Sequence, residues 1–324
     1  MVSKGSDIKS VWLEPVPNLI SDTFKAWSSK AHVEPISIPG YWMDRRGLDA
    51  LVGASPEFGE KVIYSLHGGA FFFYSASPRD FIAAVPRGLL AHCAPVRRIF
   101  ATEYRLSVSP RDQHVSPFPA ALLDTLAGYV YLTRVVGFAP ENIIVVGDSA
   151  GANLALALTR YLIEHRGLPG LPEVPGALIL LSPWADLTGS DHVPGSSTYT
   201  NVGIDYMQSP ASPESVRWVK QYFGPLGDEA AFSRYVSPAS VDRRTEDASF
   251  TGFPRTLVVL GELETFYTQA RTLVEKMRRD MGAGRGEGQV DYYEAADSIH
   301  DFLAIPLHEP ERTQTLRYIA NWIA

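Results

Sequence analysis

The sequence predicts an α/β protein built on a mostly parallel central sheet with helices on both faces. Three observations support this fold class. With 45% apolar and 20% charged residues, the 324-residue chain has the composition of an ordinary globular protein. Its short aliphatic runs are apolar throughout rather than alternating, as in a parallel sheet that is covered on both faces. Helical patterns separate these runs, which is the arrangement of βαβ units.

The strand candidates follow one another along the chain and end in turn residues. Runs rich in Val, Ile and Leu lie at 62–66, 98–102, 143–146, 177–181 and 256–260, and a weaker run lies at 290–294. Apolar residues at helical spacing predict helices at 119–136, 150–166, 265–281 and about 309–323. Gly137 and Gly167 follow two of these segments and fit helix C-terminal stops.

Two regions break this alternation. Residues 1–50 have no clear period, and residues 185–253 are rich in Pro, Ser and Gly, with one predicted helix at 213–223. A structureless loop of that length is uncommon inside a compact domain. We therefore expect 1–50 and 185–253 to form a cap, while 51–184 and 254–324 form the two parts of the main α/β domain. Open α/β sheets bind ligands at the carboxyl ends of their strands, so the cap should cover that edge.

Charge and composition exclude several functions. The formal charge is −7 and the Lys and Arg residues are scattered, so we expect no nucleic-acid binding. No run reaches the ~18 apolar residues that span a bilayer, and the N-terminus lacks the apolar core of a secretory signal, so a cytoplasmic protein is expected. The lone Cys93 excludes an internal disulfide, and no His, Cys or Asp cluster has metal-ligand spacing.

The segment GDSAG at 147–151 carries the strongest chemical signal. It follows the strand at 143–146 and opens the next helix, which is the context that gives a G-x-S-x-G motif its meaning. Such a turn lifts the serine above the sheet in a strained conformation, and it requires small flanking residues. Ser149 is therefore the predicted nucleophile. Asp148 is expected to support this turn beside the substrate.

A second motif, HGGA at 67–70, comes directly after the strand at 62–66. A loop of small residues leaves backbone N–H groups available to a developing oxyanion. The predicted donors are the N–H groups of Gly68, Gly69 and Ala150, the residue after the nucleophile. His67 precedes the loop, and we interpret it as a structural hydrogen-bonding residue rather than a catalytic base.

Together these motifs resemble the hormone-sensitive-lipase-like esterases of the α/β-hydrolase family, in the branch with a GDSAG motif. Further matches are YRL at 104–106, PFPAAL at 117–122, SPWADLT at 182–188 and SP at 237–238. The resemblance covers roughly residues 60–324. It implies an α/β-hydrolase fold with a helical cap, and a cofactor-free serine hydrolase that cleaves short- to medium-chain carboxylic esters. Ala70 replaces the last Gly of the usual HGGG, which keeps the backbone N–H in place.

The resemblance also implies the partners of Ser149. His300 lies in SIHDF at 298–302, just after the strand at 290–294, and this segment is similar to the family's catalytic histidine loop. The family's acid follows the strand at 256–260, where this sequence reads GELET. Glu264 takes the place of the usual Asp and is preferred over Glu262, with Asp297 as a remote third candidate. A carboxylate there would stabilise the imidazolium.

These residues predict a Ser–His–Glu triad that forms an acyl-enzyme from a small-molecule ester, as a monomer or a homodimer. The segment FFFY at 71–74 is expected to lie partly in the core, with one or two rings lining the acyl pocket, for which Phe71 and Phe72 are the candidates. A lactonase, a natural-product deacetylase or an acyltransferase would use the same triad, because function depends on the site rather than the fold. A ligand-binding pseudoenzyme is a further alternative, which the presence of His300 disfavours.

Overall fold

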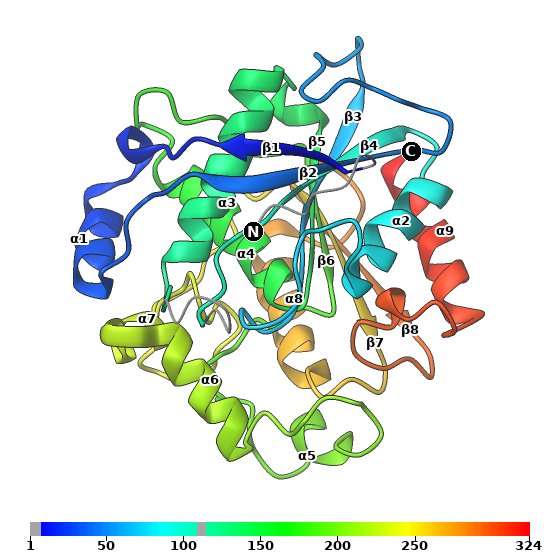
Figure 1. Cartoon of the computed structure of the whole chain (residues 1–324). Helices are drawn as coiled ribbons and strands as arrows, with labels where there is room; N and C mark the ends of the chain where they lie inside the picture. The colour runs from blue at the N-terminus through cyan, green and yellow to red at the C-terminus, as the bar shows by residue number, and fades with distance from the viewer. Residues whose placement is uncertain (1–7, 109–114) are drawn as a thin grey trace.

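The computed structural model describes residues 8–108 and 115–324 and confirms the predicted fold class. Its centre is an eight-stranded sheet with strand order β1-β2-β4-β3-β5-β6-β7-β8 (Figure 1). The strands from β3 to β8 are parallel, whereas β1 and β2 are antiparallel to their neighbours. The strands are β1 Lys9–Leu13, β2 Ile38–Asp44, β3 Lys61–Leu66, β4 Val96–Thr102, β5 Ile143–Asp148, β6 Ala177–Leu181, β7 Arg255–Gly261 and β8 Val290–Ala295.

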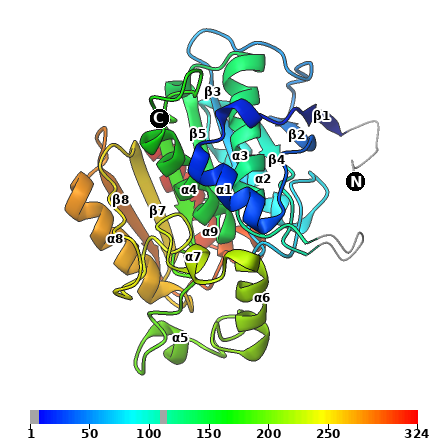
Figure 2. The ribbon, with the colours of Figure 1, turned by 90° about the vertical axis from the view of Figure 1, so that its left-hand side faces the viewer.

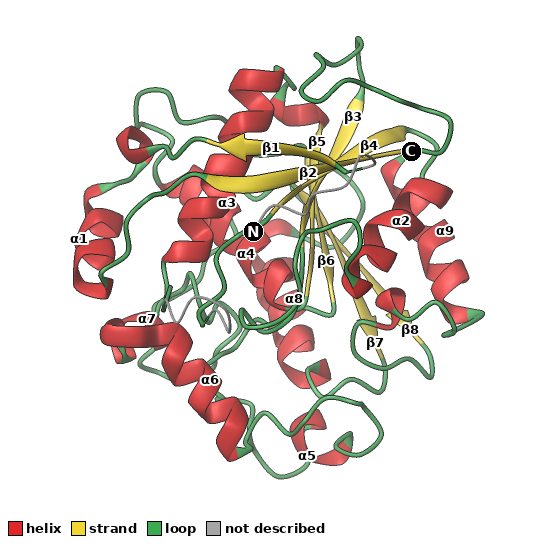
Figure 3. Ribbon diagram, viewed as in Figure 1, coloured by secondary structure: helices red, strands yellow, loops and turns green. Residues whose placement is uncertain are grey.

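Helices cover both faces of the sheet, as Figure 3 shows. One face carries α3, α4 and α8, and the other carries α2 and α9. The predicted helix at 119–136 is an α-helix that continues as a π-helical turn, Tyr131–Val136. The longer helices are α1 Asp22–Ala31, α2 Ala84–His92, α3 Ala120–Val130, α4 Ala150–Glu164, α6 Pro213–Phe223, α8 Tyr267–Met281 and α9 Glu311–Ile323.

The central strands supply two separate hydrophobic cores, one on each side of the sheet. Along β3, Val62, Tyr64 and Leu66 belong to the core beneath α3, α4 and α8, whereas Ile63 belongs to the core beneath α2 and α9. Successive side chains of a strand point to opposite faces. Because both faces are buried, most positions of these strands are apolar, and this explains the aliphatic runs in the sequence.

The structure corrects the expected role of residues 1–50. The strand β1 pairs with β2, and β2 pairs with β4, so both strands extend the main sheet rather than form a cap. Pro39 and Gly40 lie within β2. Both residue types are uncommon in strands, so the strand pattern is hard to recognise in the sequence. Gly40 is required there, because a Cβ atom would lie 2.4 Å from the Phe100 ring. Helix α1 of this segment contacts the 185–253 region, and residues 1–7 lie outside the described residues.

The helical part of residues 185–253 lies beyond the carboxyl ends of the central strands, as Figures 1 and 2 show together. This region holds the short helices α5, Ser197–Thr200, and α7, Asp228–Ala231, and the longer α6, which confirms the helix predicted at 213–223. Helix α6 begins at Pro213, and the Ser212 hydroxyl caps it by accepting the N–H of Ser215 at 3.2 Å.

Candidate active site

Ser149 occupies a sharp turn between β5 and α4. Its φ of 52° and ψ of −114° are strained for a residue with a side chain, as the motif predicted. A Cβ atom on Gly147 would lie 2.2 Å from the carbonyl oxygen of Gly151, and one on Gly151 would lie 2.0 Å from that of Leu66. Both flanking positions therefore exclude any side chain, which is why the turn has this sequence.

Ser149, His300 and Glu264 come together at the carboxyl ends of the strands. The Ser149 Oγ lies 3.0 Å from His300 Nε2, and His300 Nδ1 lies 3.3 Å from Glu264 Oε2. All three side chains are buried. The three loops that carry them follow β5, β8 and β7, which end at the same edge of the sheet. The arrangement has the geometry of a nucleophile, a base and an acid that orients the base.

Glu264 is fixed by further hydrogen bonds. Its Oε1 accepts the Ser182 hydroxyl at 2.7 Å and the N–H of Gly261 at 2.6 Å. Burial raises the pKa of Glu264, and the hydrogen bond to His300 partly opposes this rise. For His300, burial lowers the pKa, but the negative charges of Asp301 and Glu264 outweigh it and raise the pKa to about 9. The imidazolium form is therefore favoured in this site.

The alternative acids lie elsewhere. Glu262 and Asp297 are both exposed, and the Asp297 N–H donates to Glu262 Oε2 at 3.4 Å. Within the described part of the chain, neither carboxylate contacts His300. Of the candidates left open by the sequence, only Glu264 reaches the imidazole.

The structure corrects one of the expected oxyanion donors. The N–H of Gly68 donates to Asp148 Oδ2 at 2.7 Å, so it is already engaged. Asp148 reaches it because β5 and β3 are neighbouring strands that end side by side. The N–H groups of Gly69, Ala70 and Ala150 have no such partner among the described residues. Gly69 and Ala70 also line the main cavity, so Ala70 replaces Gly68 as the candidate donor.

His67 is buried and supports this loop from its own strand end. Its ring stacks on Tyr104 with centroids 4.2 Å apart, and the Tyr104 hydroxyl donates to the His67 carbonyl at 2.6 Å. Burial lowers the pKa of His67 to about 4, so the ring is neutral at physiological pH. These contacts are structural, and Nε2 of His300 holds the hydrogen-bonding position next to Ser149.

The aromatic segment at 71–74 places other rings in the cavity than the expected Phe71 and Phe72. Phe71 is completely buried and stacks on Tyr222 at 3.9 Å, and the Phe72 ring packs against Trp218. Neither ring lines the cavity, whereas Phe73 and Tyr74 do. Ala70 and Phe71 both have a positive φ, so the chain turns twice at this point and carries the predicted rings into the core.

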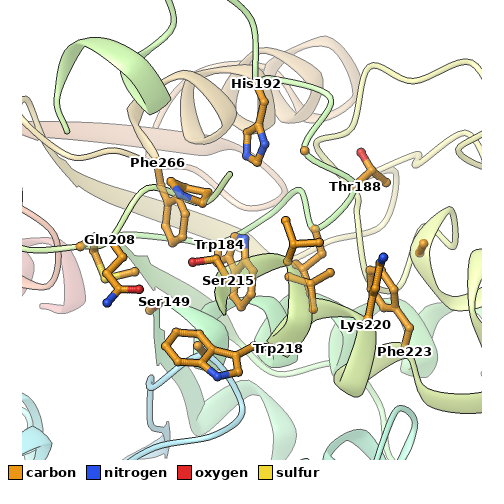
Figure 4. Close-up of a pocket in the computed structure, with 18 of the residues that line it drawn as sticks. Ser149, Trp184, Thr188, His192, Gln208, Ser215, Trp218, Lys220, Phe223 and Phe266 are labelled. Carbon is orange, nitrogen blue, oxygen red and sulfur yellow. The ribbon is translucent and has the colours of Figure 1, made fainter. Parts of the chain in front are cut away.

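A cavity of about 510 Å³ opens above Ser149 (Figure 4). Trp184, Trp218 and Phe266 line the part that Figure 4 shows next to Ser149. Much of the remaining wall comes from the 185–253 segment, and its apolar members include Leu187, Met207, Val216, Val219, Phe223 and Phe232. Sites for small organic ligands have this size and this apolar character with a few polar groups.

Sequence reasoning missed two residues that organise the site. Ser182 lies in the SPWADLT motif after β6, but its link to Glu264 could not be read from the motif. Asp205 lies in the irregular 185–253 segment, where no pattern marked it. Its carboxylate accepts the backbone N–H groups of His300 at 3.3 Å and Thr265 at 2.8 Å.

Comparison with known proteins shows the family of this fold. The sequence profile of a family described as alpha/beta hydrolase fold matches residues 63–304, which is most of the chain. The chain belongs to the α/β-hydrolase fold family. This hydrolase is 28% identical over 291 residues to an esterase of Acinetobacter venetianus, a match that covers 90% of the chain and 81% of the relative. It is 31% identical over 215 residues to an acetyl-hydrolase of Streptomyces hygroscopicus, covering 66% of the chain and 60% of the relative.

Solved structures of other α/β-hydrolases have the same fold. An esterase/lipase from an uncultured bacterium matches with a TM-score of 0.66 and 23% identity, over 99% of this chain and 86% of that one. A hormone-sensitive lipase from a metagenome library matches with a TM-score of 0.65 and 25% identity, over 88% and 80%. The family match and these neighbours confirm the resemblance to hormone-sensitive-lipase-like esterases. Among its described helices, this hydrolase has none with the length and apolar character needed to cross a membrane.

Proposed function

We propose that this chain is a carboxylic ester hydrolase in which Ser149 is the nucleophile, His300 the general base and Glu264 the acid that orients it. The observation that carries the proposal is the 3.0 Å contact between Ser149 Oγ and His300 Nε2 at the wall of an apolar cavity. The names of relatives, an esterase and an acetyl-hydrolase, support the same bond class.

Acylation begins when Ser149 Oγ attacks the ester carbonyl carbon and His300 Nε2 takes the hydroxyl proton. The carbonyl oxygen becomes an oxyanion, which the N–H groups of Gly69, Ala70 and Ala150 stabilise. Glu264 lies beside Nδ1 and stabilises the imidazolium that forms. When the tetrahedral intermediate collapses, His300 gives its Nε2 proton to the departing alcohol oxygen, and the acyl group remains on Ser149.

Deacylation repeats these steps with water as the nucleophile. His300 Nε2 removes a proton from water, whose oxygen attacks the acyl carbon and forms a second oxyanion in the same site. Collapse of this intermediate breaks the bond to Ser149 Oγ, and the imidazolium returns a proton to that oxygen. The products are an alcohol and a carboxylic acid, and the enzyme is restored.

The cavity supports short- to medium-chain or compact acyl esters as substrates. Its walls next to Ser149 are aromatic, and fixed aromatic walls favour an apolar group of limited size. A preference for acetyl esters over esters of longer acyl chains would favour the deacetylase alternative. The similarity to an acetyl-hydrolase supports the same alternative. A cytoplasmic location, a monomeric or homodimeric state and the absence of nucleic-acid binding stay predictions.

The test is hydrolysis of a p-nitrophenyl ester series, from acetate to dodecanoate, by the wild type and Ser149→Ala. We expect Ser149→Ala to lose at least about a thousandfold in kcat. Ser215→Ala is the matched control, because Ser215 lines the same cavity, and it should stay within about threefold of the wild type. Equal rates for the wild type and Ser149→Ala would overturn the nucleophile assignment. A wild type that turns over no ester but gains thermal stability from one would favour the ligand-binding alternative.

A further inference from the structure

A second carboxylate lies against the imidazole of His300. Asp301 Oδ2 is 3.3 Å from Nε2, the same nitrogen that lies 3.0 Å from Ser149 Oγ. Glu264 Oε2 lies 3.3 Å from the other ring nitrogen. The ring is therefore held between two buried carboxyl groups, whereas a nucleophile–base–acid arrangement requires only the one at Nδ1.

Asp301 is held in this place by its backbone. Its N–H donates to the Ser182 hydroxyl oxygen at 3.1 Å, and the same hydroxyl donates to Glu264, so one serine links the Asp301 backbone to the Glu264 carboxylate. The Asp301 side chain is 6% exposed. Its Oδ1 is buried and has no hydrogen-bond partner among the described residues. A buried carboxylate oxygen without a partner is costly, so the ion pair with His300 is what compensates the burial of Asp301.

We propose that Asp301 is a positioning residue that acts through His300, where its charge at Nε2 favours the imidazolium and moves the onset of ester hydrolysis to higher pH. The inference rests on the proposed function, since it concerns the same base. Asp301 and Ser149 compete for Nε2. The charge stabilises the imidazolium that forms during attack, and it also stabilises the imidazolium of the resting enzyme, which cannot act as a base.

Other titratable groups also face this ring. Asp205 accepts the backbone N–H of His300, and Asp148, at the end of β5, lies near enough to interact with both Asp301 and His300. The Tyr206 ring lies 6.2 Å from the imidazole, and Tyr74 lies within electrostatic reach of Asp301. Of the acidic groups, only Asp301 forms an ion pair with Nε2 among the described residues. Ionisation of Asp148 would partly replace a lost Asp301 charge, so removal of Asp301 should shift the titration only in part.

The experiment compares Asp301→Asn and Asp301→Gly with Asp297→Asn. Asp297 is a matched control, because it lies in the same loop, also has a positive φ, is exposed and does not contact His300. Asn and Gly both tolerate a positive φ, so each variant keeps the backbone geometry. Two quantities are measured: the pH at the midpoint of the acid limb of kcat/KM with p-nitrophenyl butyrate, and the ¹⁵N NMR titration of the His300 ring, assigned by comparison with His300→Gln.

We expect both Asp301 variants to lower the midpoint and the His300 titration by about one pH unit, and so to raise kcat/KM by up to about tenfold on the acid side. Asp297→Asn should leave both unchanged. An unmoved midpoint, or an equal shift in Asp297→Asn, overturns the proposal. The wild-type protein is itself a test. A His300 ring that titrates with the ordinary histidine pKa of about 6.5 would mean that no second charge acts on it. If the ring titration shifts but no ester is hydrolysed, the proposed function fails, and only the effect of Asp301 on the protonation of His300 stands.

Discussion

Replacement of Glu264 by Gln is the sharpest test of the acid in the triad. The substitution conserves shape and removes the charge beside His300 Nδ1. The amide oxygen of Gln can still accept from Ser182 or Gly261, which leaves an NH₂ group facing the ring. An NH₂ group cannot accept the Nδ1 proton, so the ring is driven into the wrong tautomer and loses the stabilisation of its charged form.

The distance between Glu264 Oε2 and His300 Nδ1 sets the size of the expected loss in kcat. Two unit charges 3.3 Å apart attract by roughly 5 kcal/mol at an effective dielectric constant of about 20. Because about 1.4 kcal/mol corresponds to a factor of ten in rate, loss of this interaction lowers kcat by at most about four orders of magnitude. We expect a fall of about a thousandfold or more, since the wrong tautomer also opposes base catalysis.

The assay is kcat for p-nitrophenyl butyrate, measured together with thermal melting so that unfolding is recognised. Glu262→Gln is the matched control, because Glu262 belongs to the same loop but is exposed. It should retain the wild-type rate within about twofold, as an exposed substitution does. A Glu264→Gln variant that is folded and loses less than about tenfold would refute the charge argument, because the interaction would then be far weaker than the distance requires.

Two further changes test the cavity and its link to the triad. Trp218→Ala opens the wall beside Ser149, so the ratio of kcat/KM for octanoate over acetate p-nitrophenyl esters should rise by about tenfold; an unchanged ratio would exclude Trp218 from the acyl site. Asp205→Asn weakens the acceptor of the His300 and Thr265 N–H groups, so kcat should fall and the free energy of unfolding should drop by about 1–3 kcal/mol, measured by urea unfolding. A Tm and kcat equal to those of the wild type would contradict this role.

The three residues of the proposed triad could be located from the sequence because they follow strand ends. Ser149, Glu264 and His300 come after β5, β7 and β8, and parallel strands place their carboxyl ends at one edge of the sheet. The resemblance to a known family then separated Glu264 from Glu262, a choice that periodicity alone does not make. These positions depend on the local chain and on the order of the elements, both of which can be read from a sequence.

Other features depend on contacts between distant parts of the chain. The Gly68 N–H donates a hydrogen bond to the Asp148 side chain, which comes from a neighbouring strand. The burial of Phe71 follows from the positive φ angles of Ala70 and Phe71. No residue of the sequence HGGAF at 67–71 predicts these two angles. The strand β2 contains Pro39 and Gly40, residues that usually argue against a strand, and its pairing with β1 and β4 outweighs that preference.

Asp205 gives the 185–253 segment a second structural role besides lining the cavity. Its carboxylate bonds to the backbone of both the His300 loop and the loop after Glu264, so a residue of this segment spans the base and the acid. Any movement of this segment that withdraws Asp205 would leave two buried N–H groups without an acceptor, and the loops would have to shift to recover one. Because Ser149, His300 and Glu264 meet through contacts of 3.0 and 3.3 Å, even a small shift would weaken proton transfer. The segment that lines the cavity therefore also helps to hold His300, the proposed base, in position.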